Sequence, residues 1–370
     1  MKFGLNATCF NDRPSGAKQR FVGIYGELIK RLSDAEFVVY EPSDCRVASW
    51  FGAAPNVFAR PTPLPSEGRV RKLVTGLGYW HSVLARERFD LFEALHLPLV
   101  KAPTGRTILT VHDLRGLGRD CGIVERAVYR TVLGRSLRAA DHVVTVSVAM
   151  KEEILSNFPD LPISVVYNGL DAHAGDSDSE AEMVAVRRKL ALPEDFILAV
   201  GHFEKRKNYG RLIDAMALLR DRGRACSLLV IGNDSGLKQV LEKQVAALAL
   251  SDSISLVSGL SDLEVHCAYR LCKLFVFPST YEGFGIPLLE AMAAGRPMVV
   301  SDLPVFREIT QDRGNYFEPY AVESIAQAIE NVLASTSEQE RLAAYGRHRV
   351  LDFSFESLAA RIETVYRSLI

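Results

Sequence analysis

The sequence has few of the features that mark secreted, membrane-spanning or disulfide-stabilised proteins. No apolar run reaches the roughly 18 residues that a membrane-spanning helix needs. The first residues run into polar sequence at residues 11–13, so we expect no signal peptide. Six cysteines are spread over 370 residues, and the nearest pair, Cys267 and Cys272, lies in apolar sequence. Buried thiols in a reducing compartment explain this spacing, which predicts a cytoplasmic protein.

Motifs for common cofactors are also missing. The chain has no Gly-Lys-Ser/Thr phosphate loop, and the Gly-Leu-Gly pairs at residues 76–78 and 116–118 are too short to indicate dinucleotide binding. No His-x-x-x-His or paired Cys-x-x-Cys supports a metal site. Asp176 and Asp178 form an Asp-x-Asp motif, but they lie in a Ser/Asp-rich stretch that we interpret as solvated linker. We therefore predict no cofactor and no bound metal.

The length and composition of the chain predict a folded protein of two or three domains. Apolar residues make up 48% of the 370 residues and charged residues 24%, which is ordinary for a globular protein. The net charge of −1 hides an asymmetry, because residues 1–168 carry 22 basic against 17 acidic side chains, and residues 169–370 carry 22 against 28. A basic half joined to an acidic half indicates that one surface meets anions.

Short apolar strands alternate with amphipathic helices along the chain, which predicts parallel sheets covered on both faces. We expect strands at residues 34–40, 91–95, 107–111, 142–146, 196–200, 227–231, 254–257, 274–277 and 297–301. We expect loops or linkers at residues 55–68 and 171–182, and helices at residues 123–140 and 354–369. The chain is thus an α/β protein with two doubly wound domains, residues 1–169 and 170–353, facing across a cleft. A final helix is expected at residues 354–370.

The densest motif is the string PSTYEGFGIPLLEAMAAG at residues 278–295. It follows a predicted strand, passes a glycine turn and enters a helix with Pro287 in the first turn. The amides of a first helical turn favour an anion such as a diphosphate. Glu282 lies before this turn and Glu290 about one helical turn after it, and both carboxylates can accept hydrogen bonds from hydroxyls. The string therefore suits a nucleotide sugar, which has hydroxyls on both sides of its diphosphate.

This string resembles the Glu-x7-Glu signature of retaining glycosyltransferases of family 4, which have the GT-B fold of two Rossmann-like domains. The resemblance implies that the final helix, residues 354–370, returns to the first domain. Two further motifs extend the resemblance over nearly the whole chain. Residues 168–171, NGLD, are similar to the family's interdomain turn, and residues 200–208, VGHFEKRKN, are similar to its Gly-x4-Arg-Lys-Asn element. Many relatives carry arginine where this chain has His202, which leaves an additional phosphate contact at that position in doubt.

The resemblance implies a role for each matched residue of the second half. Arg206 and Lys207 contact the donor diphosphate, where two cations would neutralise the charge of the leaving group. Glu282 contacts the transferred sugar and Glu290 the ribose. The other donor-binding residues implied are Gly201, Gly283, Phe284, Gly285 and Ile286. We expect these side chains to lie in an open cleft, so that their removal changes the melting temperature little.

Matches in the first half concern the acceptor side. The sequence TVHDL at residues 110–114 resembles the His-Asp-Leu element of the mannosyl- and rhamnosyltransferase branches. This resemblance implies that His112 lies near the reacting sugar, although a lone histidine is more often structural. Arg13 and Gly16 belong to a stretch that resembles the family's first glycine loop, which lies beside the acceptor and the phosphates.

The resemblance implies a retaining, metal-independent α-hexosyltransferase. We expect it to move a hexose, with GDP-mannose as the favoured donor, to a hydroxyl of a growing, polyprenyl-linked glycan in lipopolysaccharide or related polysaccharide synthesis. Other readings stay open, namely a GDP-rhamnose or UDP-hexose donor, a sugar-nucleotide epimerase or phosphorylase on the same fold, and a non-enzymatic binding module. No nucleic-acid partner is predicted, and the sequence does not specify the acceptor, the linkage position or the oligomeric state.

Basic residues gather at residues 101–140, where eight Lys or Arg stand against three Asp or Glu. Several recur at intervals of four or seven, namely Arg115, Arg119, Arg126 and Arg130. A helix would bring these arginines to one side among apolar residues, a face that suits an anionic membrane surface. A solvated helix with acidic neighbours explains the pattern equally well. Because the family uses lipid-linked acceptors, we expect peripheral attachment at the inner face of the plasma membrane.

Overall fold

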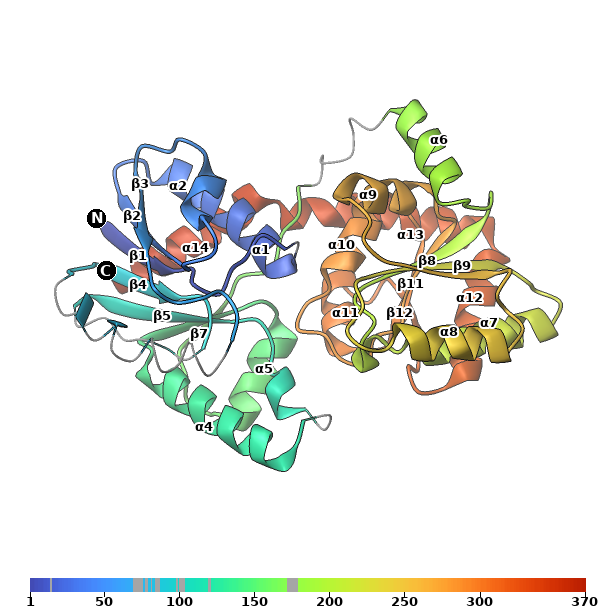
Figure 1. Ribbon diagram of the computed structural model, residues 1–370, viewed down its shortest axis with the longest axis horizontal. Helices are drawn as coiled ribbons and strands as arrows, with labels where there is room; N and C mark the ends of the chain where they lie inside the picture. Colours follow the sequence, from blue (N-terminus) through green and yellow to red (C-terminus); the bar gives the residue numbers. More distant parts are fainter. Residues whose placement is uncertain are drawn as a thin grey trace. The chain divides into compact units, whose positions relative to one another are not determined.

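The computed structural model describes residues 1–13, 15–68, 76, 79–80, 82–83, 87–97, 99, 104–118, 121–171 and 179–370. These residues form two compact units (Figure 1). The first unit comprises Met1–Gly169 together with Phe353–Ile370, and the second comprises Leu170–Asp352. Each unit is a parallel β-sheet with helices on both faces, so the predicted α/β architecture of two Rossmann-like units is confirmed.

Among the described residues, the first unit forms a seven-stranded parallel sheet. The strands are β1 (Lys2–Asn6), β2 (Glu36–Glu41), β3 (Val57–Pro61), β4 (Leu91–Ala94), β5 (Arg106–Val111), β6 (His142–Thr145) and β7 (Ile163–Val165). Their order across the sheet is β3-β2-β1-β4-β5-β6-β7. The sheet therefore grows in one direction from β1 to β3 and in the other from β4 onward, with the switch point between β1 and β4.

Helices cover both faces of this first sheet (Figure 1). One face carries α1 (Gly16–Arg20), the π-helical turn η1 (Phe21–Tyr25), α2 (Gly26–Arg31) and α14 (Phe355–Leu369). The other carries α4 (Ile123–Ala139) and α5 (Val148–Asn157). The apolar positions of α14 are buried against the sheet, as the helical spacing of Leu358, Ile362 and Tyr366 requires.

A buried carboxylate joins α14 to the first sheet. Glu93 of β4 is inaccessible to solvent, and its Oε1 accepts hydrogen bonds from Tyr25 Oη at 2.6 Å and from Thr110 Oγ1. Its Oε2 accepts from Tyr366 Oη of α14 at 2.5 Å. Because hydroxyl donors reach both oxygens, the buried carboxylate has the hydrogen bonds that compensate for lost water. The last helix is therefore part of the first unit.

Among the described residues, the second unit forms a six-stranded parallel sheet. The strands are β8 (Phe196–Val200), β9 (Ser227–Ile231), β10 (Ile254–Val257), β11 (Leu274–Phe277), β12 (Met298–Ser301) and β13 (Asn315–Phe317). Their order, β10-β9-β8-β11-β12-β13, repeats the crossover pattern of the first sheet and places the switch point between β8 and β11. Open parallel sheets bind ligands beyond the carboxyl ends of the strands at this point.

The helices of the second unit form two layers (Figure 1). One layer contains α7 (Tyr209–Asp221), α8 (Lys238–Ala247) and α12 (Val322–Leu333). The other contains α9 (Asp262–Leu271), α10 (Ile286–Ala293) and α13 (Thr336–Arg349), with α6 (Glu180–Lys189) against α9. A further short helix, α11 (Pro304–Thr310), lies between β12 and β13 in sequence. The chain leaves α7 through Gly223, whose φ of +72° is a conformation that favours glycine.

Three local expectations are wrong. Residues 55–68, expected as a loop, contain β3, whose largely exposed side chains give no apolar strand pattern. The expected linker at residues 171–182 includes the start of α6, because Ser179 and Glu182 form a capping box. The rest of that linker, with Asp176 and Asp178, lies outside the described residues. Arg115 lies in a separate helical turn, η3 (Arg115–Leu117), rather than on α4. Arg119 is also outside the described part.

Candidate active site

The candidate residues of the second unit gather at its switch point. Gly201 directly follows β8, and Ser279 lies two residues after the neighbouring strand β11. Gly201 has a φ of +145°, and a Cβ at this position would lie 2.8 Å from Cε of Lys207. Glycine therefore allows the Lys207 side chain to run along the backbone at the end of β8.

The Glu282 carboxylate is held by two cations and a hydroxyl. Its Oε1 lies 2.7 Å from Lys207 Nζ and 2.7 Å from Arg206 Nη1, and it accepts a hydrogen bond from Ser279 Oγ at 2.8 Å. No donor among the described residues contacts its second oxygen, Oε2. The carboxylate thus has a fixed orientation and one oxygen available for a ligand.

Both members of the lysine–glutamate pair are largely buried. Lys207 is 5% exposed, and its Nζ lies 4.8 Å from the centre of the Phe277 ring. Burial lowers the pKa of Lys207, although the charge of Glu282 opposes this shift. Burial by itself would raise the pKa of Glu282, but Lys207 and then Arg206 outweigh it, so the pKa falls below its ordinary value. The expectation that these side chains lie in an open cleft is therefore wrong, because Lys207 and Glu282 are largely buried in the protein.

Arg206 also connects the loops that follow β8 and β11. It belongs to the short turn η4 (Lys205–Lys207), and its Nη2 pairs with Glu204 Oε1 at 2.6 Å. Its Nη1 donates to the carbonyl oxygen of Tyr281 at 3.2 Å, and its own carbonyl accepts from the amide of Thr280 at 2.8 Å. These contacts attach the two loops to each other and fix the cations beside Glu282.

The glycine turn leads into α10 with its first amides uncapped. Gly285, at the N-cap, has a φ of +128°, and a Cβ there would lie 2.9 Å from Cε1 of Phe306. Phe284 is buried, Ile286 begins the helix, and Pro287 lies in its first turn. Within the described ranges no side-chain hydrogen bond caps this helix, so its N-terminal amides can bind an anion. The turn between Gly283 and Ile286 is thus shaped as the motif predicts.

Glu290 lies on α10 and is held by a residue of α9. Tyr269 Oη donates to Glu290 Oε2 at 2.8 Å. Burial raises the pKa of Glu290, and the hydrogen bond from Tyr269 opposes this shift. Neither Tyr269 nor Ser279 belongs to the site residues predicted from the sequence. Ser279 stands three residues before Glu282 and could have been found from that proximity, whereas Tyr269 falls among apolar positions of α9.

His112 of the first unit lies one residue beyond β5. Burial, followed by the positive charge of Arg20, lowers the pKa of His112 to about 4. Arg20 is itself buried, and its Nη1 donates to the carbonyl oxygens of Val166 at 3.0 Å and Tyr167 at 2.5 Å. His112 is therefore neutral at physiological pH and can donate and accept hydrogen bonds at the carboxyl end of the sheet.

The first glycine loop is less well defined as a site. Arg13 is exposed and pairs with Glu67, with Nη1 2.9 Å from Oε1. Gly16 is the first residue of α1, and Ser15 caps this helix by accepting from the amide of Lys18 at 3.2 Å. Gly16 therefore begins α1, Arg13 lies three residues before this helix, and the described contacts of this loop are structural.

The switch point of the first sheet carries polar residues that were not predicted as site residues from the sequence. Thr8 lies two residues after β1, and His96 lies two residues after β4. Thr8 Oγ1 is 2.9 Å from His96 Nε2 and 2.8 Å from Asn6 Oδ1. Thr8 and His96 could have been predicted as neighbours only from their positions after β1 and β4. That these two strands are adjacent in the sheet is not evident from the sequence.

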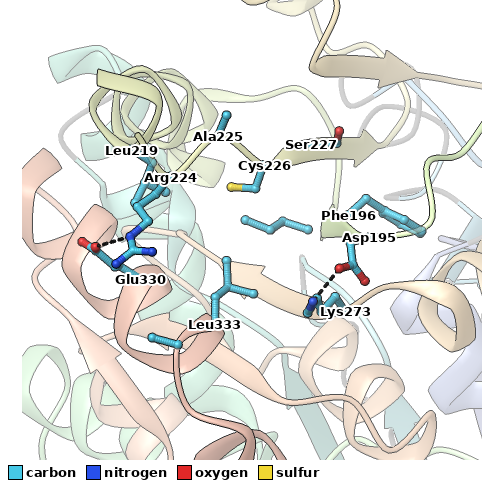
Figure 2. A pocket seen from close by; sticks show the side chains of 12 residues that line it. Asp195, Phe196, Leu219, Arg224, Ala225, Cys226, Ser227, Lys273, Glu330 and Leu333 are labelled. Carbon is cyan, nitrogen blue, oxygen red and sulfur yellow. Dashed lines mark hydrogen bonds and ion pairs between the residues drawn. The ribbon is translucent and has the colours of Figure 1, made fainter. Parts of the chain in front are cut away.

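A pocket of about 350 Å³ in the second unit lies away from this site (Figure 2). It opens at the amino ends of β8 and β9, the edge of the sheet opposite Gly201 and Glu282. Its charged side chains pair with each other, since Arg224 Nε lies 3.3 Å from Glu330 Oε1 and Lys273 pairs with Asp195. The pocket therefore offers no unpaired cation for a diphosphate.

Two family models match the chain and together span most of both units. Residues 25–174 match Glycosyltransferase Family 4, and residues 185–349 match Glycosyl transferases group 1. The chain therefore belongs to the glycosyltransferases and has the two Rossmann-like units of the GT-B fold.

Curated relatives place the chain near enzymes of O-antigen synthesis. It is 29% identical over 238 residues to the O-antigen chain mannosyltransferase RfbU of Salmonella typhimurium, covering 64% of this chain and 62% of that protein. It is 30% identical over 241 residues to the O-antigen chain mannosyltransferase B of Escherichia coli, covering 64% and 63%. The matched stretch thus spans somewhat less than two thirds of either relative.

Solved structures share the fold over the whole chain. A sucrose-phosphate synthase from Thermosynechococcus elongatus has a TM-score of 0.78 at 19% identity, covering 100% of this chain and 98% of that one. Anabaena HepE in complex with UDP and glucose has a TM-score of 0.74 at 19% identity, covering 100% of both chains. At these identities the likeness shows the fold.

Proposed function

We propose that the chain is a retaining hexosyltransferase that takes its sugar from a nucleotide diphosphate donor. The observation that carries this proposal is the buried cluster of Glu282, Lys207 and Arg206 at the β8/β11 switch point. This cluster adjoins an uncapped helix start, and Glu290 follows on the same helix. Cations and helix amides suit a diphosphate, and carboxylates suit the hydroxyls on its two sides.

Each group then has a definite part in the transfer. Glu282 Oε2 accepts a hydrogen bond from a hydroxyl of the transferred sugar. The other oxygen, Oε1, already contacts Lys207, Arg206 and Ser279. Lys207 and Arg206 stabilise the negative charge that develops on the leaving diphosphate. The acceptor hydroxyl attacks the anomeric carbon from the face that the diphosphate leaves, and a leaving phosphate oxygen takes its proton. The anomeric configuration is retained, and no covalent enzyme intermediate forms.

Positioning supplies the rest of the rate enhancement. His112, neutral because of its lowered pKa, orients a hydroxyl beside the reacting carbon. Arg13 and Gly16 belong to the loop assigned to the acceptor and the phosphates. Because cationic side chains and helix amides neutralise the diphosphate, the reaction needs no metal. In the described ranges no group of three or more His, Cys, Asp or Glu side chains could hold one.

The proposed donor is GDP-mannose and the proposed acceptor a lipid-linked glycan of cell-surface polysaccharide. Support for mannose comes from the relatives that are named mannosyltransferases and from the His-Asp-Leu element at residues 112–114. A UDP-hexose is the second candidate, since a protein of the same fold was solved with UDP and glucose.

Ligand-induced stabilisation followed by turnover tests the proposal. GDP should raise the melting temperature of the purified chain, and UDP should do so if the second candidate holds. GDP-mannose with a glycan acceptor should then give a mannosylated product with retained configuration. Incubation with donor alone should leave the sugar nucleotide unchanged, because an epimerase would alter it without an acceptor. Stabilisation by neither nucleotide, or the same turnover in Lys207→Met, would refute the assigned site.

We also propose that α4 attaches the first unit to an anionic membrane surface. The amino-terminal half of this helix exposes three apolar side chains, Ile123 at 78%, Val124 at 77% and Val128 at 58%. Exposed Arg130 and Arg138 lie on the same helix. Apolar side chains among arginines suit the interface of an anionic bilayer. In the part of the chain that the structure describes, no helix has the length and hydropathy to cross a membrane.

Vesicle co-sedimentation tests this attachment. Binding to vesicles that contain phosphatidylglycerol should fall as salt rises, because the attraction is screened. It should also fall in the triple variant Arg126→Glu, Arg130→Glu, Arg138→Glu. The matched control changes three exposed basic residues of the second unit, Arg188, Arg222 and Lys243, to glutamate and should bind like the unchanged protein. Equal binding to neutral and anionic vesicles would contradict the proposal.

A further inference from the structure

Tyr269 is a buried residue of α9 whose hydroxyl points at the candidate donor site. Its Oη donates to Glu290 Oε2 at 2.8 Å. Its ring packs against Phe275 of β11, with ring centres 5.5 Å apart, so the hydroxyl has little freedom to move. The other oxygen of Glu290, Oε1, has no partner among the described residues. One oxygen is therefore fixed by the protein while the other is available.

We propose that Tyr269 is a positioning residue that sets the orientation and the ionisation of Glu290 for binding the donor ribose. This inference rests on the proposed function, in which Glu290 accepts hydrogen bonds from the ribose hydroxyls. A carboxylate on a helix can rotate about its side-chain bonds, and a hydrogen bond from a neighbouring helix selects one rotamer. Tyr269 thus prepares Oε1 for the ligand without touching the ligand itself.

The charge balance around Glu290 makes this hydrogen bond important. The ionisable groups acting on it are Tyr269 and Asp262 of α9 and Lys207 of η4. Burial raises the pKa of Glu290 and Asp262 adds to this shift, while Tyr269 and Lys207 oppose it. Loss of the Tyr269 hydroxyl therefore frees the carboxylate to rotate and also favours its protonated form. A protonated carboxyl is a poorer acceptor for ribose hydroxyls.

Discrimination between ribose and dideoxyribose is the measurement that isolates this role. The purified full chain is titrated with GDP and with 2′,3′-dideoxy-GDP by calorimetry, and UDP with its dideoxy analogue serves as the second pair. Tyr269→Phe should weaken binding of the ribonucleotide about ten-fold, the effect of losing a charge-assisted hydrogen bond. Binding of the dideoxy nucleotide should stay unchanged. Arg206→Met should weaken both nucleotides by the same factor, because Arg206 acts on the diphosphate and is not among the charged groups that act on Glu290.

The pH dependence of this discrimination gives a second readout. Protonation of Glu290 removes the preference for ribose at low pH, and the midpoint of this loss should lie at higher pH in Tyr269→Phe. Tyr345→Phe is the matched control, since its hydroxyl donates to the carbonyl of Thr310 at 2.7 Å in the same unit. This control should keep both the preference and its midpoint. A loss of folding stability alone would weaken ribose and dideoxyribose nucleotides equally.

The outcomes separate this inference from the proposed function. An unchanged preference and midpoint in Tyr269→Phe, with both lost in Glu290→Gln, would overturn the inference alone. An unchanged preference in Glu290→Gln would show that Glu290 does not bind ribose and would refute its assignment in the proposed function. Should Tyr269→Phe not fold, 3-fluorotyrosine at position 269 keeps the hydroxyl and strengthens it as a donor. The midpoint should then move to lower pH, and an unmoved midpoint would overturn the inference.

Discussion

Lys207→Met and Glu282→Gln should separate the stability of the second unit from its chemistry. Each substitution removes one partner of the pair in which Lys207 Nζ lies 2.7 Å from Glu282 Oε1. Lys207→Met leaves the carboxylate with Arg206 at 2.7 Å and Ser279 at 2.8 Å, and it removes the ammonium of a residue that is 5% exposed. Glu282→Gln instead leaves Lys207 and Arg206 beside each other without the negative charge between them.

The magnitudes follow from what each variant leaves unpaired. Breaking a buried ion pair so that a charge loses its partner costs about 3 kcal/mol, which we expect for Glu282→Gln. Lys207→Met leaves no orphaned charge and should cost about 1 kcal/mol. In a unit of this size each kcal/mol lowers the melting temperature by about 2–4 °C. Turnover should fall by about two powers of ten in both variants, or about 3 kcal/mol of transition-state stabilisation.

Urea unfolding and transfer of labelled sugar measure the two effects separately. The matched control is Lys273→Met, since Lys273 Nζ pairs with Asp195 Oδ2 in the same unit and both of these side chains are more than one third exposed. This control should keep the turnover of the unchanged protein and lose less than about 1 kcal/mol of stability. Equal stability losses in Lys207→Met and Glu282→Gln, or turnover near that of the unchanged protein in Lys207→Met, would refute the reasoning.

Two further predictions concern metal and pH. Excess chelator should leave turnover unchanged, because Arg206, Lys207 and the amides of α10 neutralise the diphosphate. If chelator abolishes turnover and a divalent cation restores it, the prediction is wrong, and Asp176 and Asp178 become the candidate metal ligands. His112 should be uncharged above about pH 5, because its pKa is lowered to about 4. His112→Ala should therefore lower turnover by the same factor at pH 6 and pH 8, and a loss confined to pH 6 would contradict a neutral role.

Much of the fold and the donor-side motif could be predicted because both depend on local sequence. Strand–turn–helix order identifies a parallel sheet, and loops after adjacent strands meet at one edge. The Glu282 string and the Arg206–Lys207 element could thus be placed at strand ends from their neighbours in sequence. Strand β3 escaped prediction because its exposed side chains give no apolar alternation.

The side-chain partners could not be predicted, because they depend on packing between elements. The Tyr269 hydroxyl meets a carboxylate 21 residues away only when α9 and α10 lie side by side. Burial of Lys207 was also hidden, since charged residues are normally assigned to the surface. Its side chain is enclosed because Gly201 lets it pass along the backbone and Phe277 covers it. Such enclosure comes from two segments, around Gly201 and around Phe277, that are far apart in the sequence.

The hydrogen bond from Tyr366 to Glu93 also bears on the order in which the chain can fold during synthesis. The first unit needs α14, which leaves the ribosome after the whole second unit, to supply one of the donors to its buried carboxylate. The second unit is continuous in sequence and has all its strands and helices before α14 emerges. Although domains usually complete their folding in the order of translation, the first unit here must wait until the second unit and then α14 have been synthesised. Until then Glu93 lacks one of its three hydroxyl donors, and the apolar surface that α14 covers is exposed to solvent and to chaperones.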